Sequence, residues 1–262
     1  MNVNNRLLSL LIVAALLMLT GIIGCEVETE REEIPDTLLD HSLLVFSKTD
    51  GWRHDSIEAG VDAVMALGEE NGVFVFATED AGYFNESDLD RFDAVLFLNT
   101  TETVFNDEQR EAFQAYIQNG GGFAGVHSAA DTEYDWPWYG EFVGAYFESH
   151  PSDPNVRNAE IIVENPNHIS THMLPNPWER EDEWYNFQEI PDHVEVLLRL
   201  DTDSYEGSEH PNNHPIAWFH DYDGGRAFYT GLGHTIESYS EQHFLDHLWG
   251  GLEYAMDIEP TF

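Results

Sequence analysis

A chain of 262 residues in which 42% are hydrophobic and 13% are aromatic can bury a substantial core, so the composition excludes an intrinsically disordered protein. The 50 acidic and 10 basic residues give a formal net charge of -40, which repels nucleic acids and anionic lipid headgroups and argues against both as partners. Because the carboxylates are spread along the whole chain, we interpret this charge as halophilic adaptation, in which salt screens the repulsion.

The N-terminus is typical of an exported lipoprotein. Arg6 precedes an apolar run from Leu7 to Leu19 that is too short to span a bilayer comfortably. The tetrapeptide Ile22-Ile23-Gly24-Cys25 resembles the lipobox of bacterial lipoproteins, in which cleavage before the cysteine leaves it as a lipid-bearing N-terminus. We therefore expect a signal peptide over 1–24 and a lipid anchor on Cys25, at the periplasmic or extracellular face of a bacterial cell envelope. A buried structural thiol is the alternative.

The sequence after Cys25 predicts a tether and one folded domain. Residues 25–41 are acidic and polar, which suits a tether between the lipid and an α/β domain over 42–258. Cys25 is the only cysteine, so no disulfide can form within one chain and no cysteine remains for catalysis in the domain.

Strands and helices alternate along the first half of this domain. Their order predicts a doubly wound, mainly parallel sheet with right-handed crossovers and helices on both faces. The predicted strands cover 42–47, 73–78, 94–98 and 122–126, and the predicted helices 55–70 and 106–118. The second half returns to regular elements after an aromatic, proline-broken stretch, with strands at 157–164, 194–200, 214–219 and 226–230 and a helix over 240–255. We expect the irregular stretch, including Trp136-Pro137-Trp138, to form functional loops.

The segment from Gly120 to Asp131 predicts a strand that ends in a tight elbow of small residues. In open α/β sheets ligands bind at the carboxyl ends of the strands, so His127 and Ser128 at this elbow are candidate site residues. Arg53 and His54 follow the first strand in the same way. A close-packed connection and a solvated turn are the alternatives for these two segments.

Several histidines lie at the ends of predicted elements, among them His54, His127, His150, His214 and His234. Imidazole with carboxylate is a ligand set for zinc or another borderline divalent ion. No local H-E-x-x-H motif is present, so distant segments would have to assemble such a site. The same side chains could instead act as general acid and base, with Glu183 sharing the proton.

Six segments in order resemble the trehalose-utilisation, or ThuA-like, family: GWRHDS, GGGFAGVHSAADT, FESHP, DEWY, HPIAWFHDYDGGRAFYTGLGHT and the final helix around FLDH. The resemblance runs from about Leu43 to Met256 and implies a flavodoxin-like fold similar to class I glutamine amidotransferases. In those enzymes a cysteine occupies the elbow, whereas this chain has His127 there and Ala129 in place of a glycine. The departure excludes a cysteine-dependent amidotransferase.

The family resemblance implies a link to sugar utilisation. The first hypothesis is an enzyme that hydrolyses or isomerises a disaccharide or oxidised sugar, and the second is a carbohydrate-binding lipoprotein without catalysis. A serine hydrolase using Ser128 ranks last, because the elbow lacks the G-x-S-x-G pattern. The expected catalytic residues are His127, Glu183 and His234; the substrate-binding ones are Arg53, His54, Ser128, Trp136, Tyr185 and His214; a metal such as zinc would bind His54, His127, His150 and His234.

Overall fold

The computed structural model describes residues 32–35, 39–189 and 193–258. The expected signal peptide, Cys25 and most of the tether lie outside these residues, so the lipid anchor and the tether stay predictions. The chain divides into residues 1–34 and 35–262, and the second unit contains every helix and strand described here. Among the described residues, no helix has the length and apolar character needed to cross a bilayer.

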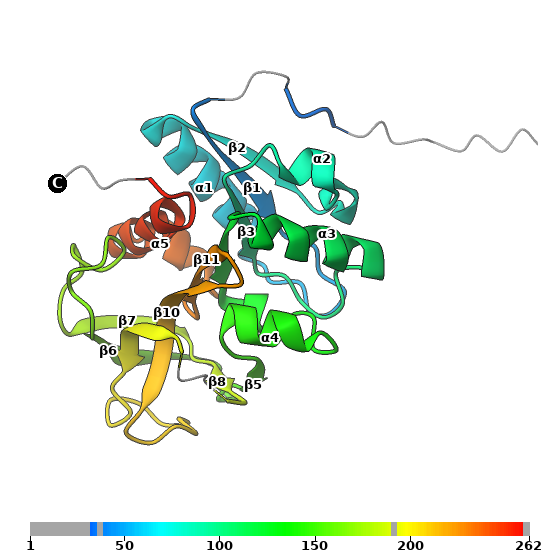
Figure 1. Cartoon of the computed structure of the whole chain (residues 1–262). Helices are drawn as coiled ribbons and strands as arrows, with labels where there is room; N and C mark the ends of the chain where they lie inside the picture. Colours follow the sequence, from blue (N-terminus) through cyan, green and yellow to red (C-terminus); the bar gives the residue numbers. More distant parts are fainter. Residues whose placement is uncertain (1–31, 36–38, 190–192, 259–262) are drawn as a thin grey trace, which may run out of the picture. The chain divides into compact units, whose positions relative to one another are not determined.

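A nine-stranded sheet forms the centre of this unit, in the order β2-β1-β3-β4-β11-β10-β9-β6-β7 (Figure 1). The first five strands are parallel, and every later pairing is antiparallel. The strands are β1 (His41–Phe46), β2 (Val73–Thr78), β3 (Ala94–Leu98), β4 (Gly122–Val126), β6 (Val156–Val163), β7 (Trp178–Glu183), β9 (Glu195–Leu200), β10 (His214–Tyr222) and β11 (Gly225–Thr230). A separate two-stranded sheet pairs β5 (Phe147–Ser149) with β8 (Asn186–Phe187).

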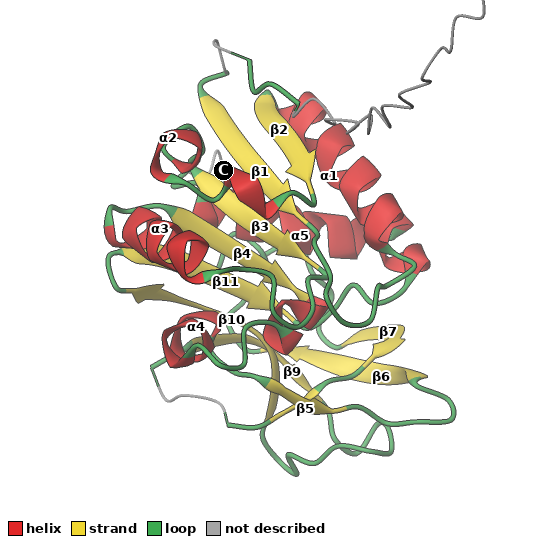
Figure 2. Cartoon of the chain, turned by 90° about the vertical axis from the view of Figure 1, so that its right-hand side faces the viewer, coloured by secondary structure: helices red, strands yellow, loops and turns green. Residues whose placement is uncertain are grey.

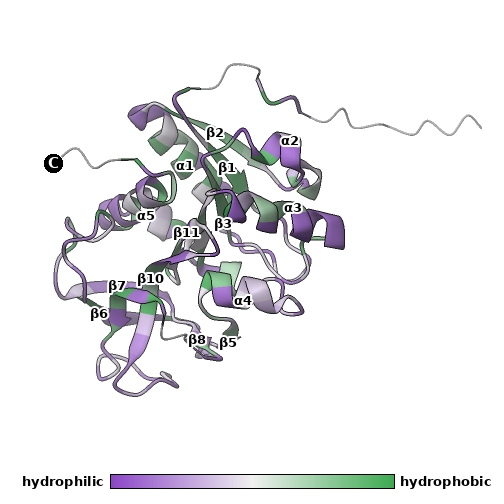
Figure 3. Cartoon of the chain, viewed as in Figure 1, coloured by the Kyte–Doolittle hydropathy of each residue, from purple (hydrophilic) through white to green (hydrophobic). Residues whose placement is uncertain are grey.

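Helices cover both faces of the parallel half (Figure 2). On one face α1 (Ile57–Asn71) and α5 (Gln242–Ala255) pack together, and on the other lie α2 (Glu86–Leu89), α3 (Asp107–Gln118) and α4 (Pro137–Val143). This double cover explains why β3 and β4 are buried along their whole length. Figure 3 shows the same division, with apolar residues in the central strands and polar ones on the outside of α3. The doubly wound, flavodoxin-like architecture is confirmed.

Local signals place the ends of the helices. Asn106 and Gln109 form the capping box that starts α3, with side chain to backbone bonds in both directions. Gly72 ends α1 in the left-handed conformation, with φ of 71°. Inside, the Phe97 ring of β3 lies 5.3 Å from Phe113 of α3 and 5.2 Å from Phe123 of β4, so aromatic packing joins the sheet to its helix.

Two segments that we expected to be loops form a helix and a strand. Trp136-Pro137-Trp138 was expected in a loop, but Pro137 is the first residue of α4, where its restricted φ favours a helix start. Residues 178–183 form β7, whose inward positions alternate as in any half-buried strand but include Arg180 and Asp182. These charged side chains removed the apolar alternation by which a strand is recognised.

Because His247 of α5 is buried, we expect the free energy of unfolding to fall as the pH drops from about 7 to 5. Its ring bonds the Ser170 carbonyl and the Thr230 hydroxyl, and burial lowers its pKa to about 3. Between about pH 7 and pH 5 the unfolded chain, with an ordinary imidazole, binds more protons than the folded one. Stability therefore falls as the pH drops through the unfolded value, and we expect this residue to remove about 2 kcal/mol over that interval.

Denaturant titrations at the two pH values test this share of the pH dependence. In His247→Gln the free energy of unfolding should fall by about 2 kcal/mol less over this interval than in the wild type, whatever the absolute stability of the variant. His243→Gln, at an exposed position of the same helix, should follow the wild type. A pH dependence in His247→Gln equal to that of the wild type would contradict the assignment.

Candidate functional site

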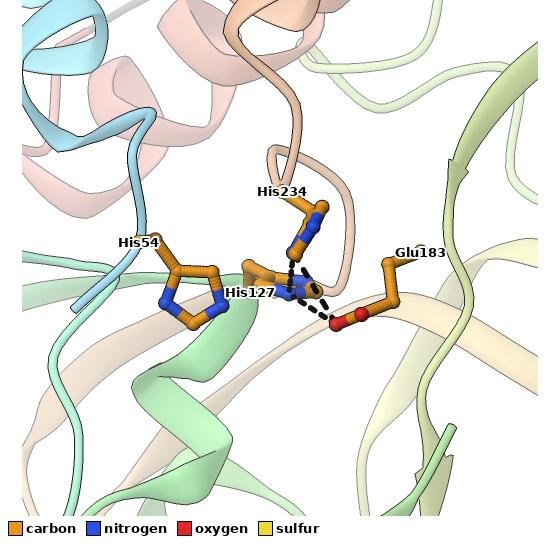
Figure 4. Close-up of side chains that lie close together, drawn as sticks. All are labelled: His54, His127, Glu183 and His234. Atoms are coloured by element: carbon orange, nitrogen blue, oxygen red, sulfur yellow. Dashed lines mark hydrogen bonds and ion pairs between the residues drawn. The ribbon is translucent and has the colours of Figure 1, made fainter. Parts of the chain in front are cut away.

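Four side chains from distant segments meet at the carboxyl edge of the sheet. His54 follows β1, His127 follows β4, His234 follows β11, and Glu183 is the last residue of β7. Four successive antiparallel pairings separate β7 from β11, so β7 again runs in the direction of the parallel strands and its end lies on the same edge. One ligand atom from each of the four residues lies within 4.8 Å of the others (Figure 4).

His127 directs its Nε2 atom at this group. Its Nδ1 atom lies 3.0 Å from the Gly231 carbonyl oxygen, which can only accept, so Nδ1 carries a hydrogen and Nε2 is the ring nitrogen that faces the group. Nε2 lies 3.3 Å from Glu183 Oε2 and 3.2 Å from His234 Nδ1. The residue is fully buried with φ of 49°, a conformation uncommon outside glycine that turns the ring into the site. An imidazole held through Nδ1 in this way is arranged like a typical metal ligand.

Glu183 supplies the negative charge of the group. Oε2 faces both His127 and His234 at 3.3 Å, and Oε1 accepts a hydrogen bond from Asn155 Nδ2 at 2.7 Å. Burial is the largest influence on its pKa and raises it, but the hydrogen bonds and charges of His127 and His234 together lower the pKa far below the usual range. Glu183 is therefore ionised and available as an oxygen ligand.

His54 is held neutral. Its Nδ1 lies 3.3 Å from Ser128 Oγ, and its other ring nitrogen points toward the three partners in Figure 4. Burial, followed by repulsion from the imidazoles of His127 and His234, lowers the pKa of His54 to about 2. Neutral imidazole is the form that binds a metal ion.

His234 behaves differently. Burial, the largest influence, lowers its pKa, but the hydrogen bond and charge of Glu183, helped by Asp182 and Asp55, outweigh it and raise the pKa above the ordinary value. Nδ1 can thus hold a proton between Glu183 Oε2 and His127 Nε2, at 3.3 Å and 3.2 Å. A divalent cation would satisfy the same acceptors by displacing that proton, so three imidazoles and one carboxylate fit a borderline divalent ion.

The buried carboxylate of Asp182 joins two parts of the site. It accepts backbone hydrogen bonds from its neighbour Glu183 at 3.0 Å, from Gly233 at 2.8 Å and from His234 at 3.1 Å. Arg180, which lies over the Trp178 ring at 5.0 Å from its centroid, pairs with the same carboxylate at 3.1 Å. Asp182 therefore fixes the end of β7 against the loop after β11.

A cleft of about 640 Å³ opens onto these side chains. His54, Glu183 and His234 lie on its wall together with Asp131 and Trp52. Burial raises the pKa of Asp131, and the Tyr134 hydroxyl, which donates to its carboxylate, opposes this only in part. The volume is within the range of about 300–1,000 Å³ that is usual for sites that bind small molecules.

A family model described as "Trehalose utilisation" matches residues 42–255. The chain belongs to the ThuA family. A search among curated proteins found no match.

Solved structures share the ThuA fold with this chain. A thua-like protein from Bacteroides uniformis is 21% identical, covers 86% of this chain and 95% of its own, and has a TM-score of 0.71. One from Parabacteroides merdae is 19% identical over 82% and 90%, with a TM-score of 0.64. A β-galactosidase from Bacillus circulans is 14% identical and covers 86% of this chain but 32% of its own, with a TM-score of 0.57. Identities this low establish the fold alone.

Three further candidates lie beside the group of four. His150 was expected among the metal ligands, but the group of four contains Glu183 instead. Its Nδ1 lies 3.5 Å from Glu183 Oε1 and 2.9 Å from the Pro151 carbonyl, so His150 borders the cleft as a neighbour of the group. Tyr185 packs its ring on His127, with 4.0 Å between centroids. Ser128 contacts His54 but is fully buried, which gives the serine hydrolase hypothesis no exposed nucleophile.

The remaining substrate-binding candidates lie elsewhere. Arg53 does not line the cleft and forms ion pairs with Glu58 and Glu79 at 2.8 Å. Trp136, directly before α4, stacks on Trp138 of that helix, with 4.9 Å between centroids. The buried His214 bonds the Tyr185 carbonyl at 2.8 Å and supports the site from behind. Conversely, Trp52, Asp131, Asn155 and Asp182 were not singled out from the sequence, although the segments GWRHDS, GGGFAGVHSAADT and DEWY contain three of them.

Proposed function

We propose that this ThuA-family protein hydrolyses or isomerises a disaccharide or an oxidised sugar at a divalent-metal site formed by His54, His127, Glu183 and His234. The observation that carries the proposal is the convergence of these four ligand atoms within 4.8 Å at a cleft of about 640 Å³. The family's description, trehalose utilisation, supports a sugar as the substrate. A bound divalent ion such as zinc would polarise a sugar oxygen as a Lewis acid.

The side chains around the group divide the remaining tasks. Asn155 holds Glu183 in place through its amide, and Asp182 holds the backbone of His234. Asp131, on the same cleft, is a carboxyl group that keeps a proton more readily than a solvated one, which suits proton transfer to or from a sugar hydroxyl.

The proposal is tested by measuring the metal content of the purified protein and its conversion of sugars. The purified protein, dialysed against zinc, manganese or cobalt in turn, should retain about one ion per chain by mass spectrometry. It should then convert at least one member of a panel of disaccharides and their 3-keto forms, and a chelator should stop the reaction. The proposal fails if none of the three ions is retained. Retained metal with sugar binding but no conversion would support the non-catalytic carbohydrate-binding lipoprotein instead.

We also propose that the protein is anchored in the bacterial envelope by a lipid on Cys25. The support is the sequence: Arg6, the apolar run from Leu7 to Leu19, and the lipobox-like tetrapeptide that ends at Cys25. Cys25→Ser should abolish incorporation of labelled fatty acid and release the protein from the membrane fraction. Unchanged labelling would contradict the proposal.

A further inference from the structure

Two exposed apolar side chains lie at the cleft. The large hydrophobic residues that are exposed among the described part of the chain are Leu39, Trp52, Met65, Met173 and Ile236. Trp52 is 74% exposed and Ile236 is 52% exposed, and both line the cleft that holds His54 and His234. Trp52 comes from the loop after β1 and Ile236 from a short 3₁₀ helix after β11 (Ile236–Ser240), far apart in the sequence. Because both side chains line one cleft, a ligand in that cleft would cover apolar surface that is now in water.

The loop that carries Trp52 is firmly held. Thr101 binds it three times: its carbonyl accepts from Asp50 N at 3.1 Å, its hydroxyl accepts from Gly51 N at 3.2 Å, and the hydroxyl lies 3.2 Å from the Trp52 carbonyl. A Cβ atom on Gly51 would come within 2.5 Å of Glu102 Cγ, so any other residue here would displace the Glu102 side chain. The indole is thus presented to solvent from an ordered backbone, which lowers the entropy cost of binding a ligand.

The charges around the two apolar side chains narrow the ligand class. Asp55, Asp131 and Glu237 line the same cleft, and the whole chain has a net charge of -40. These carboxylates repel phosphorylated sugars and sugar acids, whereas they accept hydrogen bonds from neutral hydroxyl groups. An indole face packs against the C–H face of a sugar ring. An uncharged sugar meets both requirements.

We propose that Trp52 and Ile236 form a second subsite, which binds the far ring of an uncharged disaccharide while the reacting ring lies at His54, His127, Glu183 and His234. The inference rests on the proposed function and deepens it: the cleft selects two-ring, uncharged substrates. Trp52 acts here as a binding residue, and the metal ligands are independent of it.

Titration calorimetry on the zinc-loaded full chain tests the subsite. The protein is kept in a detergent that has no sugar headgroup, so that the detergent does not compete with the probes. The probes are trehalose, maltose and cellobiose with their 3-keto forms, methyl glucoside as the one-ring sugar, and trehalose 6-phosphate as the charged one. We expect at least one uncharged disaccharide to bind more tightly than methyl glucoside and trehalose 6-phosphate. Trp52→Ala should weaken that disaccharide about tenfold and leave methyl glucoside unchanged, while Trp52→Phe should keep most of the affinity.

Met173→Ala is the matched control, because it removes an exposed apolar side chain that does not line the cleft. It should bind every sugar as the wild type does, and all variants should retain the same zinc content. The subsite is refuted if Trp52→Ala binds the disaccharide like the wild type, or if methyl glucoside binds as tightly as the disaccharide. Zinc retention without binding of any probe would refute the sugar assignment of the proposed function and the subsite with it. Loss of zinc from the wild type would refute the metal site alone.

Discussion

Glu183→Gln should weaken divalent-ion binding at least about 100-fold and remove turnover, while the protein still folds. The amide keeps an oxygen for the hydrogen bond from Asn155, so the local structure is conserved. What disappears is the one negative charge and the one oxygen ligand of the group, whose Oε2 lies 3.3 Å from both His127 and His234. Zinc competition against a chromophoric chelator measures the loss of affinity.

The same strand offers a matched control for this substitution. Glu181 lies two residues earlier on the same face of β7 but is exposed to solvent, so Glu181→Gln makes the identical chemical change outside the group of four. It should bind zinc and turn over substrate as the wild type does. Equal zinc affinity in Glu183→Gln and Glu181→Gln would remove Glu183 from the site.

Among the histidines, His234 is the better probe of function than His127. His127 is fully buried, and its Nδ1–H satisfies the Gly231 carbonyl, so its removal leaves a buried acceptor unpaired. A loss of activity in His127→Ala would therefore mix a missing ligand with a loss of stability. The sequence places His127 at the elbow but says nothing of this bond.

The edge of the sheet that holds the site was predictable for a physical reason. Residues 42–47, 94–98 and 122–126 are short apolar runs typical of strands covered on both faces, and β1, β3 and β4 are found there. Parallel strands share one carboxyl edge, so His54 and His127 had to lie near each other once the strands were recognised. His234 joins them because β11 is also parallel to β4.

The fourth member of the group depends on tertiary contacts that no local pattern reveals. β7 presents Arg180 and Asp182 inward, and these are buried only because they pair with each other and with the backbone after β11. These contacts cannot be read from the sequence, in which residues 178–183 show no apolar alternation. The strand and the position of Glu183 at its end could therefore not be derived. His150, which stands beside a proline in the FESHP segment of the family resemblance, was therefore the expected ligand, and Glu183 was expected as a catalytic residue.

The second large effect is expected for substitution of Asp182, which is not one of the four proposed metal ligands. Its carboxylate accepts from the backbone of Glu183, Gly233 and His234, so it sets the distance between Glu183 and His234. In Asp182→Asn an amide NH₂ replaces one oxygen and faces the donors of Gly233 or His234, which leaves a buried N–H unpaired at a cost of about 1–3 kcal/mol. Because the two ligands then move apart, zinc affinity should fall about 10- to 100-fold.

A second buried carboxylate, Glu133, provides a control that distinguishes an effect on ligand geometry from a general loss of stability. Glu133 is also fully buried, accepts from the backbone of Val104 and Phe105 at 2.8 Å, and pairs with Arg110 at 2.6 Å. Glu133→Gln should therefore lower the melting temperature by a similar amount, yet it holds none of the loops that carry the four ligands and should bind zinc normally. If Asp182→Asn loses stability but keeps the zinc affinity of Glu133→Gln, Asp182 is a structural residue and the geometry of the site is set elsewhere.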